Sequence, residues 1–408
     1  MLSAGRILQR CDALARHSEL PGGLTRVYLS PENRAANDLV LGWMREAGLA
    51  ARLDAIGNLV GRYEGSLAGL PCLMLGSHLD TVRDAGRYDG MLGVITAIEC
   101  VAALSATGKR LPFAIEVLGF GDEEGVRFGT TMLGSRAIAG AVEAAVLESR
   151  DANGITIRQA LRAFGLDPDQ VPGVARRSGE VLAYAELHIE QGPVLEAEGL
   201  PVGVVTAING FSRLKVALQG EAGHAGTVPM NLRRDALAAA AQCVLAIERI
   251  ARGDQELVGT VGRIEARPGA INVIPGEVHF TIDVRAPRDE LREQAVRSAI
   301  AQIEAIAQQR RIGCRIEKLQ ELGVAKCAPW LMDQLDRAVA AEGVRVRRLP
   351  SGAGHDGMAL KSIADIAMLF VRCKGGISHN PAESITEEDA AVGARTLLHF
   401  IEHFAARS

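Results

Sequence analysis

Short apolar runs alternate with longer amphipathic segments along the first half of the chain. The runs 72–76 and 113–120 have the length and apolar content of buried strands, and 90–104 is predicted to be a mostly apolar helix between them. A run of the same kind occurs at 366–371, near the other end of the chain. Strands that alternate with helices predict a largely parallel sheet covered by helices, which is an α/β fold.

The pattern changes from about residue 211. The elements expected there are a strand at 214–218, a helix at 233–251, strands at 257–264 and 278–284, a helix at 290–309 and a strand at 314–319. This β-α-β-β-α-β order is typical of a small ferredoxin-like α+β unit. After about residue 323 the helix–strand pattern resumes. We therefore predict a larger α/β domain formed by 1–210 and 324–408, with a ferredoxin-like domain inserted at 211–323.

Composition and charge narrow the class of protein. A length of 408 residues suits two or three domains of about 150 residues each. The net charge is -4 and no basic stripe occurs, which argues against nucleic acid or an anionic membrane as partner. No apolar run approaches the roughly 20 residues of a membrane span. The N-terminal residues lack a secretory signal and are predicted to form an amphipathic helix. Seven scattered cysteines without a CxxC pair indicate reduced thiols in a cytoplasmic protein.

Five short pieces of the chain contain side chains that can hold a metal ion. They are Ser77-His78-Leu79-Asp80, Tyr88-Asp89-Gly90, Asp122-Glu123-Glu124, Leu187-His188-Ile189-Glu190 and Ser378-His379-Asn380. Together they supply the imidazole and carboxylate groups that a two-metal hydrolase needs. Several of them follow a predicted strand, which is where open α/β sheets place their sites.

The carboxylates in these pieces allow more than one interpretation. In an extended segment His78 and Asp80 face the same way, so that Asp80 could hydrogen-bond the imidazole and fix its tautomer. Asp89 could bridge two ions, although an Asp in such a sequence alone is more often a turn residue or a helix cap. The triplet that contains Glu123 and Glu124 is either a solvated acidic turn or a metal ligand beside a general base.

The histidines are ambiguous in the same way. Alternation places His188 on the polar face of a strand, and a solvated edge strand would give the same pattern. A lone histidine at the position of His379 would more often be structural. His224 lies between glycines that permit close approach to a ligand, so we expect it to contact substrate. The histidines expected on the surface or in packing roles are His17, His279, His399 and His403.

A glycine-rich stretch raises a different possibility. Residues 351–357 match G-x-G-x-x-G, the pattern of a dinucleotide-binding loop. Pro350 precedes the stretch, however, and no acidic residue ends a second strand at the required distance. We therefore predict a glycine-rich substrate loop that includes Gly354 and His355.

Taken together, these pieces resemble the dinuclear metallopeptidase superfamily, and more narrowly its hydantoinase/carbamoylase branch. That branch contains N-carbamoyl-L-amino-acid hydrolases, allantoate amidohydrolases and β-ureidopropionases. The segments 188–193 and 352–357 are similar to that branch in particular, because the peptidases usually carry a carboxylate where His188 stands. The resemblance extends over nearly the whole chain.

The resemblance implies a role for each residue. It implies that one divalent ion is held by His78 and His188, that the other is held by Glu124 and His379, and that Asp89 bridges them. Zinc, manganese, cobalt and nickel all suit such ligands. It further implies that Asp80 orients His78, that Glu123 is the general base and that the substrate contacts are Gln191, His224, Asn272 and Arg285.

The expected reaction is hydrolysis of the ureido C–N bond of an N-carbamoyl-L-amino acid, with amino acid, ammonia and carbon dioxide as products. Allantoate is the alternative substrate, followed by a β-ureidopropionate or a peptide, and a non-catalytic protein with a relic site is a further possibility. The resemblance also implies a homodimer formed through the inserted domain, with His224 reaching the partner's site. Because Arg285 lies on the inserted domain, we expect closure to accompany catalysis.

Overall fold

The computed structural model describes residues 2–177 and 179–407. Contacts within the chain divide it into two compact units. The first consists of Met1–Thr206, Cys327–Leu349 and Ala353–Ser408, and the second of Ala207–Lys326 and Pro350–Gly352. The short segment Pro350–Gly352, which was predicted to belong to the larger domain, is part of the second unit.

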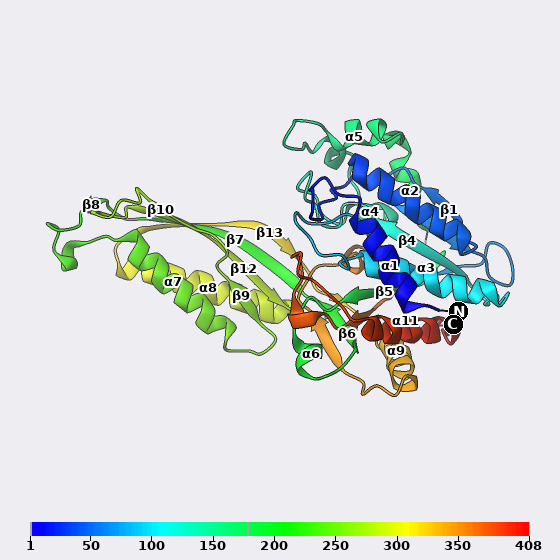
Figure 1. Ribbon diagram of the computed structural model, residues 1–408. Helices are drawn as coiled ribbons and strands as arrows, with labels where there is room; N and C mark the ends of the chain where they lie inside the picture. Colours follow the sequence, from blue (N-terminus) through cyan, green and yellow to red (C-terminus); the bar gives the residue numbers. More distant parts are fainter. Residues whose placement is uncertain (1, 178, 408) are drawn as a thin grey trace. The chain divides into compact units, whose positions relative to one another are not determined.

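A nine-stranded mixed sheet is the central element of the first unit. Its middle strands β4 (Ala114–Phe120), β3 (Cys72–His78), β5 (Val181–Ile189) and β16 (Ile366–Val371) are neighbours in that order and run parallel. Strands β4 and β5 are labelled in Figure 1. The four strands are almost entirely buried, as expected from their continuous apolar runs. The outer strands β1 (Ala50–Leu53), β2 (Leu59–Tyr63), β6 (Val202–Ile208) and β14 (Ala325–Lys326) pair with their neighbours in the antiparallel sense. Strand β15 (Arg348–Ser351) pairs with β6. The predicted α/β fold is confirmed.

Helices of the first unit pack on this sheet and on one another. The long helices are α1 (Ala4–Ala15), α2 (Pro31–Glu46), α3 (Met91–Ala106), α9 (Pro329–Ala341) and α11 (Glu387–Glu402). The short ones are α4 (Leu133–Ile138), α5 (Ile157–Ala163), α6 (Val194–Ala197) and α10 (Gly357–Leu360). Helix α3 lies against β3 and β5, and α1 and α11 pack on α3. Burial on several sides explains why α3 is apolar almost throughout.

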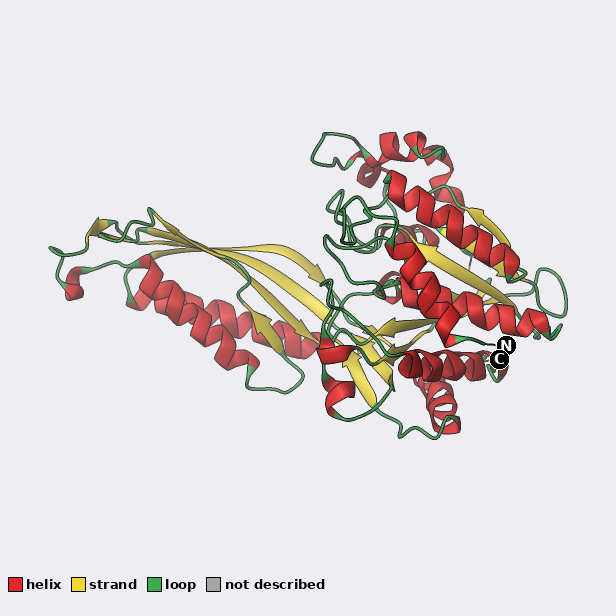
Figure 2. Cartoon of the chain, viewed as in Figure 1, coloured by secondary structure: helices red, strands yellow, loops and turns green. Residues whose placement is uncertain are grey.

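The second unit is built on a five-stranded antiparallel sheet. Its strands are β7 (Gly210–Gln219), β9 (Val258–Thr260), β10 (Ile264–Arg267), β12 (Glu277–Ala286) and β13 (Gly313–Leu322). Helices α7 (Ala236–Ala251) and α8 (Asp289–Gln309) lie side by side along the sheet (Figure 2). Buried and partly buried residues alternate along β12, and its buried side chains pack against both helices. The order of strands in the sheet, β10-β12-β7-β13, is the one expected for the predicted ferredoxin-like β-α-β-β-α-β unit.

One predicted strand of this unit differs from the structure. The segment expected as a single strand at 257–264 is two short strands, β9 and β10, which pair with different parts of β12. Gly259 and Gly262 lie in this segment, and glycine weakens a continuous strand. A separate two-stranded ribbon is formed by β8 (Gly223–His224) and β11 (Val273–Ile274). Across the described residues, none of the helices has the length and apolar character needed to cross a bilayer.

Candidate active site

Four of the five metal-binding pieces lie at the carboxyl ends of the four parallel strands. His78 ends β3, His188 is the last residue but one of β5, Glu123 and Glu124 follow β4, and His379 follows β16 by a loop. Adjacent parallel strands end at the same edge of a sheet, which brings these distant segments together. The remaining piece contains Asp89, which directly precedes Gly90, the N-cap of α3.

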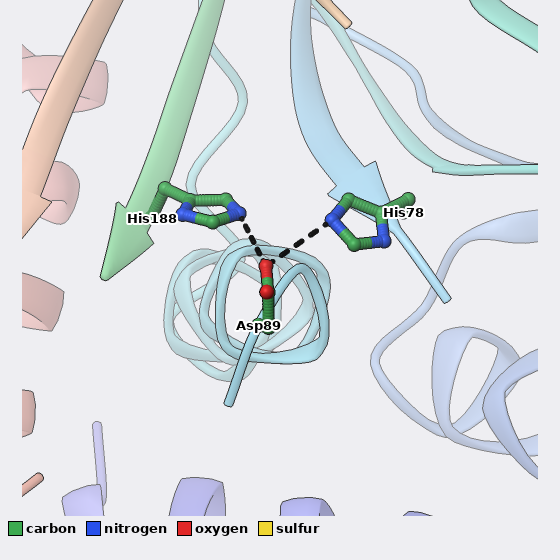
Figure 3. Close-up of side chains that lie close together, drawn as sticks. All are labelled: His78, Asp89 and His188. Atoms are coloured by element: carbon green, nitrogen blue, oxygen red, sulfur yellow. Dashed lines mark ion pairs between the residues drawn. The ribbon is translucent and has the colours of Figure 1, made fainter. Parts of the chain in front are cut away.

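The Asp89 carboxylate lies at the centre of this group. Its Oδ1 is 3.5 Å from His78 Nε2 and 3.2 Å from His188 Nε2, and the two rings approach it from either side (Figure 3). Its Oδ2 is 3.1 Å from His379 Nε2, which is also 3.6 Å from Glu124 Oε1. Each oxygen of one carboxylate therefore faces a different set of imidazoles.

Backbone contacts fix how two of the imidazoles present their nitrogens. His78 Nδ1 is 3.0 Å from the carbonyl oxygen of Asp80, and His188 Nδ1 is 2.9 Å from that of Ile189. A carbonyl only accepts, so Nδ1 carries a proton in both rings, and Nε2 is the nitrogen that faces Asp89. Loss of the Nε2 proton leaves each ring with its lone pair on Nε2. This is the tautomer that a metal ion requires from a histidine bound through Nε2.

Gly90 makes room for the His78 ring. Its φ is +70°, and a Cβ atom at this position would lie 2.5–2.6 Å from three atoms of the imidazole. Glycine is the residue that tolerates both this conformation and this approach. The glycine that follows Asp89 is thus part of the site's geometry.

Asp80 is placed differently from its prediction. Its carboxylate accepts hydrogen bonds from the backbone N–H groups of Glu123 (3.1 Å) and Glu124 (3.2 Å), and the His78 ring contacts only its backbone oxygen. The predicted bond from the Asp80 carboxylate to the imidazole is wrong because β3 ends at His78, so the alternation of a strand does not extend to residue 80. Asp80 instead holds the acidic turn against the end of β3.

Several buried carboxyl groups lie close together in the site, and their charged forms disfavour one another. Removal from water raises the pKa of Glu123 well above its ordinary value; nearby carboxylates including Glu124 and Asp356 raise it further, and His78 opposes them. Burial and the Asp89 charge raise the pKa of Glu124 to about 7. Burial would lower the pKa of His78, but its bond to Asp89 and the surrounding carboxylates raise it well above the usual value. Such a surplus of carboxylates is balanced by divalent cations in many enzymes.

The donor atoms fit metal ions in position as well as in charge. In the part of the chain that the structure describes, four sets of side chains bring ligand atoms within 4.8 Å of one another. The sets are His78, Asp89 and His188; Asp89, Glu124 and His379; His78, Glu123 and Glu124; and Glu186, His188 and His355. The first two share Asp89, so the residues present fit a pair of neighbouring ions with imidazole and carboxylate ligands.

Some residues beside the site were not singled out from the sequence. Glu186 is buried and accepts hydrogen bonds from Ser77 Oγ (2.7 Å) and Tyr184 Oη (3.0 Å). Glu383 is buried and accepts from the backbone of the Asp89 loop. The alternation around His188 contained a signal for Glu186, but nothing in the sequence pattern marked Glu383.

The predicted substrate contacts fall into two groups. In the first unit, Gln191 donates to Asp89 Oδ2 (2.9 Å), while its own Oε1 is buried without a partner. His355, next to Gly354, is buried, and its ring centre lies 4.5 Å from that of His188. In the second unit are three residues that the sequence analysis also named: His224 on β8, Asn272 next to β11 and Arg285 on β12.

The backbone is strained at three positions of the site. Asp122, Gln191 and His379 adopt left-handed conformations with φ of +59°, +57° and +52°. Non-glycine residues in this region cost free energy and persist where the surrounding structure enforces them, commonly at functional sites. The strain therefore supports the location of the site.

The α/β fold and these converging groups are typical of hydrolases that use metal ions, and the side chains form candidate metal-binding clusters. The model of peptidase family M20/M25/M40 matches residues 74–403, and the chain belongs to this family.

Relatives and solved structures narrow the resemblance. An N-carbamoyl-L-amino acid amidohydrolase of Geobacillus stearothermophilus is 46% identical over 406 residues, which cover 99% of each chain. A probable allantoate deiminase of Oryza sativa subsp. japonica is 41% identical, over 97% of this chain and 87% of the relative. A solved hydantoinase/carbamoylase family amidase from Burkholderia multivorans has a TM-score of 0.92 at 33% identity, covering 98% of this chain and 97% of the other. The predicted resemblance to this branch and the predicted enzyme class, an amidohydrolase, are confirmed.

Proposed function

We propose that the protein hydrolyses the ureido C–N bond of N-carbamoyl-L-amino acids and releases the amino acid, ammonia and carbon dioxide. One observation carries the proposal: the two oxygens of Asp89 face different imidazoles, and Glu123 lies beside them with a strongly raised pKa. The similarity to an N-carbamoyl-L-amino acid amidohydrolase at 46% identity supports the choice of substrate.

We propose that two divalent ions occupy the site, one held by His78 and His188, the other by Glu124 and His379, with Asp89 shared. Zinc, manganese, cobalt and nickel all suit these ligands. Bound there, the ions would supply Lewis acidity towards the ureido carbonyl, a poor electrophile because two nitrogens donate electron density to it. Glu123 would accept the proton of the attacking water and deliver it to the leaving nitrogen.

Arg285 is the proposed partner of the substrate carboxylate. Its Nε and Nη2 donate to Asp283 at 2.9 and 3.1 Å, and its Nη1 donates to the carbonyl oxygen of Gly352 at 2.9 Å. A guanidinium has five N–H donors, so these three contacts leave donors for another carboxylate. Asp283 and Gly352 therefore hold the planar group in one orientation, which favours specific recognition of a carboxylate.

His224 and Gln191 are the proposed partners of the ureido group. His224 Nδ1 accepts the backbone N–H of Gly226 at 3.0 Å, so its Nε2 carries a proton that can be donated to a developing oxyanion. The unpartnered Oε1 of Gln191 can accept from the ureido NH2. We further propose that Asn272, Gly354 and His355 complete the substrate contacts. The backbone of Asn272 accepts from Ala225, next to His224, which supports its inclusion.

We also propose a cytoplasmic homodimer formed through the second unit, with His224 acting in the partner's site. Apolar side chains close to the β8–β11 ribbon in sequence are exposed: Met230 by 76%, Leu232 by 65% and Ile271 by 104%. Strand β13, with most of its residues exposed, lies at an edge of the sheet. Exposed apolar groups and a free edge are typical of a surface that another chain covers. The seven free cysteines support a reducing compartment.

Allantoate is the second candidate substrate, because a relative 41% identical to the chain is named as a probable allantoate deiminase. The test is a parallel measurement of kcat/KM on an N-carbamoyl-L-amino acid, allantoate, N-carbamoyl-β-alanine and a dipeptide. We expect the highest value for the N-carbamoyl-L-amino acid. A higher value for allantoate would transfer the assignment to the second candidate, and a higher value for the dipeptide would contradict ureido hydrolysis altogether.

A further inference from the structure

Glu383 lies behind the Asp89 loop and connects it to the loop that carries His379. Its side chain is 4% exposed. Its Oε1 accepts the backbone N–H groups of Tyr88 (2.8 Å) and Asp89 (3.2 Å), and its Oε2 accepts the hydroxyl of Ser378 (3.0 Å). One buried carboxylate therefore contacts both loops.

Ser378 and Gln191 continue this network to the Asp89 carboxylate. Gln191 Nε2 lies 2.9 Å from Asp89 Oδ2 and 3.1 Å from Ser378 Oγ, and Ser378 Oγ lies 3.3 Å from Asp89 Oδ2. A hydroxyl has a single proton, and its shorter contact is the one with Glu383. Glu383 thus orients Ser378, while Gln191 donates to Asp89.

Two glycines make this arrangement possible. A Cβ atom at Gly86 would lie 2.2 Å from Glu383 Cδ and 2.4 Å from Glu383 Cβ, so any side chain there would displace the whole glutamate. A Cβ atom at Gly376 would lie 2.5 Å from backbone atoms of Gly192 and Pro193, which directly follow Gln191. The loops approach each other this closely only because both positions are glycine.

We propose that Glu383 is a positioning residue that holds the Asp89 loop and the Ser378–His379 loop in register for binding the second divalent ion. The inference rests on the proposed two-ion function. His78 and His188 lie on strands β3 and β5, whereas His379 lies on a loop and is half exposed. The ion held by Asp89 Oδ2, Glu124 and His379 therefore depends on Glu383 more than the ion held between the two strands.

The test measures zinc binding and uses no substrate. In Glu383→Gln, the new side chain keeps an oxygen for the Tyr88 and Asp89 amides, but its NH2 group cannot accept the Ser378 proton. We expect the weaker of two bound zinc ions to lose about 10–100-fold in affinity, as is typical when a group that supports a ligand is changed. The tighter ion and the melting temperature of the metal-free protein should stay at wild-type values. Zinc retained against chelators of graded strength gives the affinities. Glu388→Gln, at an exposed position of α11, is the matched control.

Two further variants keep the test decisive. Gly86→Ala should cause the same selective loss of zinc, although it removes no polar group. Ser378→Ala combined with Glu383→Gln should lower the free energy of zinc binding by less than the sum of the two single changes, because both act through one contact.

Wild-type affinity for both ions in Glu383→Gln and Gly86→Ala would overturn the proposal, as would parallel loss of both ions with a lower melting temperature. A wild-type protein that binds two zinc ions but hydrolyses no ureido acid would contradict the proposed function and leave this inference intact.

Discussion

At the residue scale, the proposed reaction depends on Glu123, a carboxyl group whose charged form is disfavoured. Removal from water and nearby carboxylates, among them Glu124 and Asp80, raise the pKa of Glu123 well above its ordinary value. A group of this kind releases its acquired proton less readily to water and is suited to pass it to a leaving nitrogen. The Glu123 side chain is not a proposed ligand of either metal ion.

Glu123→Gln should therefore lower kcat by about 10²–10⁴-fold, the usual contribution of a general acid–base group. The variant should keep its metal ions. Steady-state rates on an N-carbamoyl-L-amino acid, with metal content measured on the same samples, check both statements. Wild-type turnover with metal bound would show that another group is the base.

The pH dependence of metal binding also belongs to the residue scale. The pKa of Glu124 is raised to about 7, and that of His379 is raised by its bond to Asp89. Metal ions bind the deprotonated ligands, so affinity should fall as pH falls below 7, by about tenfold per unit for each proton displaced. The folding stability of the metal-free protein should depend on pH in the opposite direction to metal affinity. A carboxyl group with a raised pKa stabilises the fold at low pH, and this contribution is lost as pH rises through 7. Zinc titrations between pH 6 and 8 measure the effect on metal affinity. An affinity that stays constant or decreases as pH rises from 6 to 8 would contradict the prediction.

The sequence predicted which residue types meet at the site but not how each is held. The positions of His78 and Glu124 could be predicted because each lies at or just after the end of an apolar run, and that of His188 because polar and apolar residues alternate around it. The role of Asp80 could not, because it depends on where β3 ends and on backbone donors at Glu123 and Glu124. Glu383 was missed for a similar reason: its contacts with Tyr88 and Asp89 join segments far apart in the chain.

At the scale of elements, the turn into α3 sets the position of both Asp89 and His78. Gly90→Ala should abolish tight metal binding, because its Cβ would overlap the His78 ring and a left-handed alanine costs a further 1–2 kcal/mol, roughly. Gly343→Ala is the matched control: its φ is +72°, against +70° at Gly90, and nothing lies within 4 Å of the added atom. Metal content and melting temperature of both variants separate the two effects. Equal metal binding in the two variants would contradict this account of the turn.

The N-terminal helix is attached to α3 by a buried ion pair. Glu99, on α3, is buried and pairs with Arg10 at 2.7 Å and with Arg6 at 2.6 Å, both from α1. Glu99→Met should leave the largely buried Arg10 with only its longer contact to Glu46 and lower the free energy of unfolding by about 2 kcal/mol, less than for a fully buried pair because Arg6 is half exposed. Denaturant unfolding measures the loss. Zinc affinity should not change, and a large change would mean that α1 supports the metal site directly.

The limits of sequence prediction at this scale can be traced to particular segments. The strands at 72–76, 113–120 and 366–371 were predictable because they are continuous apolar runs between turn residues. The division of 257–264 into β9 and β10 was not, because glycines permit a break in a strand without showing where it falls.

At the scale of the whole molecule, the proposed dimer makes a prediction about mixed subunits. Suppose Glu123→Gln and His224→Ala subunits are each inactive and are mixed and allowed to exchange. If His224 acts in the partner's site, a mixed dimer has one site with both groups intact, and about a quarter of wild-type activity should return. If His224 acts within its own chain, the mixture should stay inactive. Recovered ammonia release after mixing is the measurement.

The proposed ureido hydrolysis depends on ions that share Asp89. The most direct measurement removes all metal with a chelator and adds zinc or manganese back in steps, while ammonia release from an N-carbamoyl-L-amino acid is recorded. The account predicts no activity in the metal-free protein and full activity only when two ions per chain are bound. Full hydrolysis by the metal-free protein, or full activity with a single ion per chain, would contradict it.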